Sequence, residues 1–253
     1  MNSDRPVIFL GAGPGDPELI TLKGRRLLDE ADVIVYAGSL VNRALIEDVR
    51  AMVHDSAGMD LGAIMGIMIA GHRAGKRVVR LHTGDPAIYG AIREQMQRLD
   101  ELSIAYEVVP GVSSALASAA ALKVELTVPE VTQTVIFTRQ AGRTPVPEQE
   151  SLKKLAAVQA TMCIFLSVSM METVASELIE GGYSENTPVA VVEKASWPEE
   201  RIVRGTLATI AEAVACSAIK KTAMIIVGRA LASDRGAVSK LYDAGFSHGY
   251  RAD

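Results

Sequence analysis

The chain has 253 residues, of which 49% are hydrophobic and 22% charged, and its formal net charge at pH 7 is −4. This is the balance of a globular protein with a sizeable core and room for one or two domains. A net negative charge excludes the global basic field of a dedicated nucleic-acid-binding protein, so we expect no nucleic-acid partner.

The sequence also predicts neither secretion nor membrane insertion. Residues 1–6 contain no apolar signal core. The apolar stretch at residues 62–71 is much shorter than the ~20 residues that a membrane-spanning helix needs. We therefore expect a cytoplasmic protein without a membrane partner.

Cysteine and histidine patterns predict neither disulfides nor a metal site. Cys163 and Cys216 are far apart, and Cys163 lies in an apolar run typical of a buried free thiol. The four histidines are scattered without a close pair. No nucleophile elbow is present either, so covalent and metal catalysis are not expected.

The first half of the chain alternates short apolar runs with helical patterns. Such alternation predicts a mostly parallel sheet with helices on both faces. Strands are expected at residues 7–10, 33–36, 51–54, 77–82 and 105–109. Helices are expected at residues 21–30, 42–49, 61–74 and 89–102.

A change in composition at residues 122–133 predicts a linker between domains 1–121 and 134–253. Strands of the second domain are expected at residues 134–138, 162–166, 189–192, 202–205 and 223–227, with helices at 151–157, 170–180 and 209–215. The turn at residues 197–200 indicates a hairpin, which makes the second sheet mixed. The fold class is thus α/β, with two α/β/α domains and an active site in the cleft between them.

The loop after the first strand resembles a dinucleotide-binding turn but departs from it. Gly11 and Gly13 fit the pattern G-x-G-x-x-G, whereas Asp16 stands at the third position. A carboxylate there repels phosphate, and Pro14 removes an amide from the turn. The backbone of this loop can therefore come close to a ligand, but the loop is poorly suited to binding a pyrophosphate.

Four further strand ends carry candidate motifs, each with two interpretations. In residues 81–90, Gly84 permits close approach of the backbone, and Asp85 either caps a helix start or binds a small polar or cationic ligand. The small residues of 109–118 favour close helix packing over ligand contact. Residues 165–171 are typical of core packing. Residues 138–147 are either a solvated loop or, through two arginines, a carboxylate-binding loop.

Taken together, these motifs resemble the tetrapyrrole methylase family. Four segments carry the resemblance in the family's order, at residues 11–24, 84–90, 110–114 and 223–229. The resemblance covers essentially the whole chain. It implies an S-adenosylmethionine-dependent methyltransferase of two α/β domains, without a metal and acting as a homodimer.

Within the family, residues 36–41, 54–59, 138–147 and 239–251 resemble the branch that methylates carbon 11 of precorrin-4, giving precorrin-5 in cobalamin biosynthesis. The branch acting on uroporphyrinogen III has Asp where Ala37 stands, and Gly-Lys-Arg-Ala-Gly in place of residues 55–58. Open alternatives are a cobalt-bound substrate, methylation at another ring position, a non-catalytic binding protein and an NAD-dependent oxidoreductase.

The resemblance also implies the site residues. Those expected to bind the cofactor are Pro14, Thr83, Gly84, Asp85, Ile88, Ser113, Ser114, Leu166 and Ala195. Those expected to bind the polycarboxylate tetrapyrrole are Gly13, Ser39, His82, Arg139, Arg143, His248 and Arg251. Leu166 and Ala195 replace residues that are often Met and Gly in the family. No residue is assigned as the proton acceptor.

Overall fold

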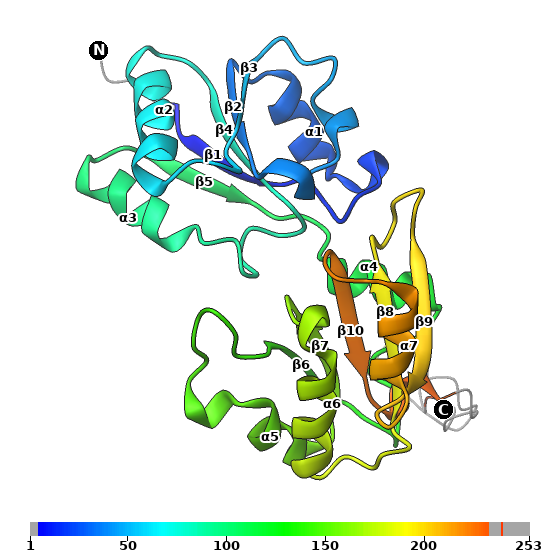
Figure 1. The fold of residues 1–253 in the computed structure, drawn as a ribbon. Coiled ribbons are helices and arrows are strands. Elements are labelled where there is room, and N and C mark those ends of the chain that lie inside the picture. The colour runs from blue at the N-terminus through cyan, green and yellow to red at the C-terminus, as the bar shows by residue number, and fades with distance from the viewer. Residues whose placement is uncertain (1–4, 233–238, 240–253) are drawn as a thin grey trace, which may run out of the picture. The chain divides into compact units, whose positions relative to one another are not determined.

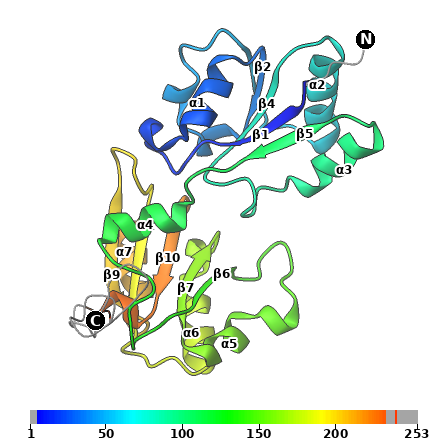
Figure 2. The ribbon, with the colours of Figure 1, turned by 180° about the vertical axis from the view of Figure 1, so that it is seen from behind.

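The computed structural model describes residues 5–232 and 239. Its contacts divide the chain into two compact units, drawn from opposite sides in Figures 1 and 2. The first unit holds Met1–Ala117 together with Lys194–Glu199, and the second holds Ser118–Glu193 and Glu200–Asp253. Within the described residues, the sheet of each unit has five strands.

The sheet of the first unit is parallel throughout its named strands. Its order is β3-β2-β4-β1-β5, and every neighbouring pair is parallel. The strands are β1 (Val7–Gly11), β2 (Val33–Tyr36), β3 (Met52–Asp55), β4 (Val78–His82) and β5 (Tyr106–Val109). The predicted strands and the parallel sheet are confirmed.

Buried side chains alternate between the two faces of this sheet. One face packs Leu10, Ile34 and Leu81 against Leu28 of α1 (Leu22–Asp29). The opposite face packs apolar side chains against α2 (Leu61–Arg73) and α3 (Arg93–Glu101), as in Figure 1. Helices α1 and α2 begin at side-chain caps, since Thr21 accepts from the Gly24 amide and Asp60 accepts from the Ala63 amide.

Two helical predictions were wrong, one because no α-helix forms and the other because the helix begins later. Residues 42–49 form no α-helix but a short 3-10 turn, η3 (Arg43–Leu45), preceded by η2 (Gly38–Leu40). The helix expected from residue 89 begins at Arg93, because Tyr89 and Ala91 have φ of 54° and 49°. A left-handed backbone at these positions interrupts the helical hydrogen-bond pattern. Residues 86–89 form a turn instead.

The sheet of the second unit is mixed, as predicted. Its order is β6-β7-β10-β8-β9, where β6 and β7 are parallel and the other pairs antiparallel. The strands are β6 (Val135–Arg139), β7 (Thr161–Phe165), β8 (Pro188–Glu193), β9 (Arg201–Thr206) and β10 (Ala223–Val227). The hairpin expected around residues 197–200 is the β8–β9 pair.

Helices and short turns complete the second unit. One large apolar core joins its sheet to α5 (Leu152–Leu155), α6 (Met171–Glu180) and α7 (Ile210–Ser217). Helix α4 (Ser114–Leu122) begins in the first unit and ends in the second. The 3-10 turns of the second unit are η4 (Glu148–Glu150), η5 (Ala156–Val158), η6 (Val168–Met170) and η7 (Arg229–Leu231), whereas η1 (Pro17–Leu19) belongs to the first unit.

Two sequence expectations can be compared with this framework. Cys163 lies in β7 as a buried free thiol whose pKa is raised by burial to about 12, whereas Cys216 is exposed. Within the described part of the chain, no helix combines the length and apolar character needed to cross a membrane.

Candidate functional site

Three glycines bring the ends of three neighbouring strands into backbone contact. Gly11 ends β1, Gly84 follows β4, and Gly111 follows β5. A Cβ on Gly11 would lie 2.6 Å from the Gly111 Cα and from the Gly84 carbonyl oxygen. A Cβ on Gly111 would also come within 3.0 Å of the Gly84 oxygen. The glycines therefore let backbones touch each other rather than cradle a phosphate.

A pair of backbone hydrogen bonds reinforces this contact. The Gly84 amide donates to the Gly13 carbonyl at 2.7 Å, and the Gly13 amide donates to the Gly84 carbonyl at 3.3 Å. Gly13 and Gly84 have φ of 79° and 60°, in the left-handed region that favours glycine. The loops after β1 and β4 are thereby joined as a miniature antiparallel bridge.

Asp85 joins the β4 loop to the β5 loop. One carboxylate oxygen accepts from the Ala87 amide at 2.8 Å, and the other accepts from the Gly111 amide at 3.0 Å. The expectation that Asp85 lies at a helix start was wrong, because the residues after it form a turn. The side chain caps that turn and also fixes Gly111, 26 residues further along the chain.

The opening loop directs its backbone groups at protein partners. The Asp16 side chain accepts from the Glu18 amide at 2.9 Å and so caps η1. The Asp16 amide itself donates to Ser196 Oγ at 3.0 Å. Because the amides of Gly13 and Asp16 both have protein acceptors, they are not available to the oxygens of a pyrophosphate.

The first turn of α4 lies next to Gly111 and offers backbone donors. Ser113 Oγ accepts from the Ala115 amide at 3.3 Å, and the Ser113 carbonyl accepts from the Leu116 amide. The amides of Ser113 and Ser114 stand at the helix N-terminus, where no intrahelical acceptor exists. Such a terminus favours an anionic group, including a carboxylate.

His82 ends β4 as a neutral, buried side chain. Only 4% of the residue is exposed, and burial, together with the charge of Arg80, lowers its pKa to about 3. Within residues 5–232 and 239, its Nε2 atom has no hydrogen-bond partner. A neutral imidazole supplies no positive charge for substrate carboxylates, so any contribution of His82 is a hydrogen bond.

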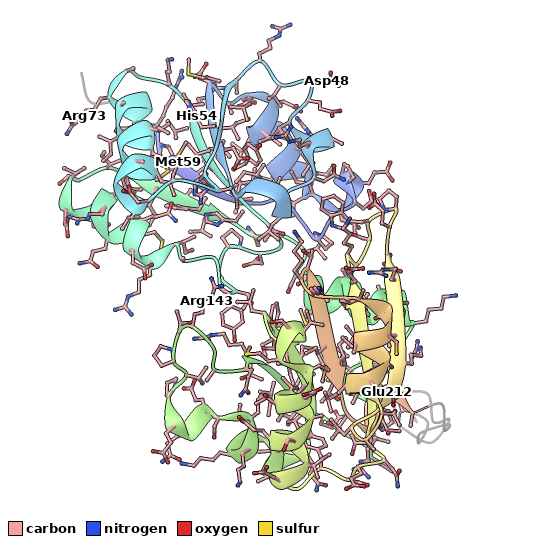
Figure 3. The ribbon with its side chains drawn as sticks, viewed as in Figure 1. Asp48, His54, Met59, Arg73, Arg143 and Glu212 are labelled. Atoms are coloured by element: carbon pink, nitrogen blue, oxygen red, sulfur yellow. The ribbon has the colours of Figure 1, made fainter. Side chains whose placement is uncertain are left out.

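In the second unit, Arg139 and Arg143 play different parts in the loop after β6. The Arg139 guanidinium donates to the carbonyls of Gln140, Thr144 and Pro145. It therefore holds the loop in shape. Arg143 is exposed on the same loop, where Figure 3 labels it. Arg143 rather than Arg139 has its charge open to an incoming anion.

Comparison with known proteins decides the family. The family described as Tetrapyrrole (Corrin/Porphyrin) Methylases matches residues 6–211. The chain belongs to the tetrapyrrole methylase family. The family resemblance seen in the sequence is therefore confirmed.

Relatives within the family are similar over almost their whole length. A cobalt-precorrin-4 C(11)-methyltransferase of Methanocaldococcus jannaschii is 59% identical over 99% of this chain and 98% of its own. A precorrin-4 C(11)-methyltransferase of Pseudomonas aeruginosa is 50% identical over 97% and 98%.

Solved structures of the same family are also similar to this chain. An X-ray structure of a cobalt precorrin-4 methyltransferase has a TM-score of 0.88 and 51% identity, and covers 90% of this chain and 96% of its own. A uroporphyrin-III C-methyl transferase of Thermus thermophilus, complexed with S-adenyl homocysteine, has a TM-score of 0.76 and 30% identity, and covers 89% and 93%.

The residues that the tetrapyrrole methylase resemblance implies fall mostly in the first unit. Among the cofactor set, that unit contains Pro14, Thr83, Gly84, Asp85, Ile88, Ser113, Ser114 and Ala195. Leu166 follows β7 in the second unit, with φ of 55° and 68% exposure. Ser39 lies in η2, while His248 and Arg251 lie outside the described residues.

The sequence did not reveal several side chains that form hydrogen bonds with loops distant in the chain. Asn42 donates to the Gly15 carbonyl at 2.8 Å, and Trp197 Nε1 donates to the Pro14 carbonyl at 2.9 Å. At the end of β2, Tyr36 donates to Asp55 at 3.0 Å and accepts from Arg43 at 3.2 Å. The pKa of the Asp55 carboxyl is lowered mainly by a hydrogen bond from the Ala57 amide, and to a smaller extent by the one from the Tyr36 hydroxyl. None of these partners is adjacent in sequence.

The buried His82 makes stability depend on pH. Its pKa is about 3 when folded, against 6.5 for the ordinary side chain. Between these values the unfolded chain binds a proton that the folded chain does not, so stability rises with pH and falls on acidification. We expect a contribution of about 1.4 kcal/mol per pH unit in this window.

Urea unfolding of the wild type and His82→Gln across this pH range measures the effect. The variant should lose less stability on acidification than the wild type. Parallel pH profiles for the two proteins would contradict the neutral, buried state of His82.

Proposed function

We propose that the protein is an S-adenosylmethionine-dependent C-methyltransferase that methylates carbon 11 of precorrin-4, giving precorrin-5 in cobalamin biosynthesis. One observation carries the proposal, the 59% identity over 253 residues to the relative from Methanocaldococcus jannaschii that is named a cobalt-precorrin-4 C(11)-methyltransferase, and thus for transfer to the same ring carbon. The relative solved with S-adenyl homocysteine supports the choice of cofactor.

The described residues suit S-adenosylmethionine. The amides at the start of α4 match the carboxylate of its methionine part, and the Thr83 hydroxyl offers a further polar group. His82, whose Nε2 has no hydrogen-bond partner among the residues that the structure describes, immediately precedes Thr83. The cofactor has no phosphate, so the repulsion between a phosphate and the carboxylate of Asp16 does not arise.

When bound, the sulfonium of the cofactor supplies an electrophilic methyl group. The residues of the chain contribute position and shelter from water rather than a nucleophile. Fixing two reactants in line contributes about 7–11 kcal/mol to lowering a barrier. The hydrogen-bonded loops after β1, β4 and β5 provide the required rigidity.

Further features of the proposal rest on the family resemblance. We propose a cytoplasmic homodimer that needs no metal of its own. The natural substrate is either metal-free or cobalt-bound, since the two relatives are named for precorrin-4 and for cobalt-precorrin-4.

Locating the transferred methyl tests the proposal. The purified protein is incubated with S-adenosylmethionine carrying a ¹³C-methyl group and with metal-free or cobalt-bound precorrin-4 in parallel. NMR of the product should place the label on carbon 11 of the ring. A label on another carbon would contradict the assigned position, and absence of transfer to both substrates would contradict the activity.

Arg143→Ala tests how substrate carboxylates are bound. Because this arginine is exposed on the loop that Arg139 shapes, its loss should raise KM for the tetrapyrrole about fivefold, equivalent to about 1 kcal/mol. The affinity for S-adenosylmethionine should not change. Steady-state kinetics with each substrate varied in turn measure both.

Arg98→Ala is the matched control for this variant. Arg98 is an exposed arginine of α3 paired with Glu101, outside the strand-end loops. Its replacement should leave both KM values as in the wild type. An equal tetrapyrrole KM for Arg143→Ala and the wild type would exclude Arg143 from substrate binding.

A further inference from the structure

The segment Lys194–Glu199 connects β8 to β9, yet its contacts group it with the first unit. It carries Trp197, the single tryptophan of the chain. Trp197 Nε1 donates to the Pro14 carbonyl at 2.9 Å. The indole ring also covers Gly15, where an added Cβ would come well within 3.0 Å of it. The tryptophan therefore contacts the opening loop by a hydrogen bond and by packing.

Two more side chains hold the same stretch of loop. Ser196 Oγ accepts from the Asp16 amide at 3.0 Å, and Asn42 donates to the Gly15 carbonyl at 2.8 Å. Three consecutive residues of the loop thus have a backbone group bonded to a side chain from outside it. Loops normally satisfy such groups with water or local turns, whereas here side chains from distant parts of the chain do so.

The backbone of the segment is itself unusual. Lys194 and Ser196 have φ of 48° and 68°, which non-glycine residues adopt at a cost. The Lys194 ammonium lies 5.8 Å from the centroid of the Trp197 ring and 3.7 Å from a carboxylate oxygen of Glu199. A strained backbone persists where its surroundings fix it. The contacts of Trp197 and Ser196 with the opening loop supply that constraint.

We propose that Trp197 is a positioning residue for the methyl donor, an inference that rests on the proposed function. Its indole bonds to Pro14 in the opening loop, and Trp197 stands two residues after Ala195 in the chain. Pro14 and Ala195 are both expected to contact S-adenosylmethionine. The indole need not touch the cofactor. It sets the spacing between two stretches of chain that lie 181 positions apart and that bind the same molecule.

Trp197→Phe isolates the hydrogen bond from the packing. The phenyl ring keeps an aromatic surface over Gly15 but has no donor for the Pro14 carbonyl. Calorimetry with S-adenosylhomocysteine should show an affinity about fivefold weaker than that of the wild type, as for loss of one hydrogen bond. The KM for S-adenosylmethionine should rise in parallel, while kcat at saturating cofactor changes less.

Tyr183→Phe is the matched control. Tyr183 is a buried aromatic residue of the second unit whose hydroxyl donates to the Ala160 carbonyl. The control therefore also removes an aromatic donor from a backbone carbonyl. It should lower the free energy of unfolding without changing the affinity for S-adenosylhomocysteine, which separates a positioning role from a purely structural one.

A second pair of variants tests the packing independently. Gly15 has no left-handed backbone, so alanine there meets the Trp197 ring as its main obstacle. Gly15→Ala should weaken S-adenosylhomocysteine binding in the wild type but have almost no further effect in a Trp197→Ala background. This dependence is the signature of two residues that act through one contact.

The outcomes separate the inference from the proposed function. Wild-type protein that fails to bind S-adenosylhomocysteine would overturn both. Wild-type protein that binds it, with equal affinity in Trp197→Phe and with additive effects of Gly15→Ala and Trp197→Ala, would overturn the positioning role alone. Weaker binding in Trp197→Phe with an unchanged Tyr183→Phe control supports it.

Discussion

Direct backbone contact between three strand-end loops is the constraint on which the candidate site depends. A Cβ on Gly11 or Gly111 would clash with the neighbouring backbone and force the loops apart, while Gly84 brings its carbonyl oxygen into the contact through a left-handed backbone with φ of 60°. The strand order makes the contact possible, since β4, β1 and β5 are neighbours and parallel, and their carboxyl ends share one edge. The glycine pattern thus reflects a requirement of protein packing, although it resembles a phosphate-binding turn.

The polar groups around this contact are arranged to keep it fixed. Asp85 accepts from two backbone amides on different loops, and three side chains hold the opening loop. A methyl transfer that needs no protein nucleophile depends on the alignment of two bound reactants. In the proposed function, the contribution of these hydrogen-bonded loops is to keep that alignment. The helix N-terminus at Ser113 and Ser114 lies beside these loops, and such a terminus favours an anionic group.

Local patterns in the sequence predicted much of the fold but only part of the site. Alternating apolar runs identified the strands, because burial in a parallel sheet leaves a strong signal. The helix expected at residues 42–49 was wrong, and the left-handed Tyr89 and Ala91 gave no local warning of the late start of α3. Motif order and spacing identified the family. The partners of Asp85 and Trp197 did not emerge, since Gly111 and Pro14 lie 26 and 183 positions away.

Cofactor affinity after Gly111→Ala tests most directly whether the glycine contact shapes the site. An added Cβ at this position meets the Gly84 carbonyl, whereas one at Gly66 of α2 meets no atom of the described residues within 4 Å. With circular dichroism confirming a folded protein, Gly111→Ala should bind S-adenosylhomocysteine about tenfold or more weakly, a loss of about 1.4 kcal/mol. Gly66→Ala should bind it as the wild type does. Unchanged affinity in a folded Gly111→Ala variant would contradict the account.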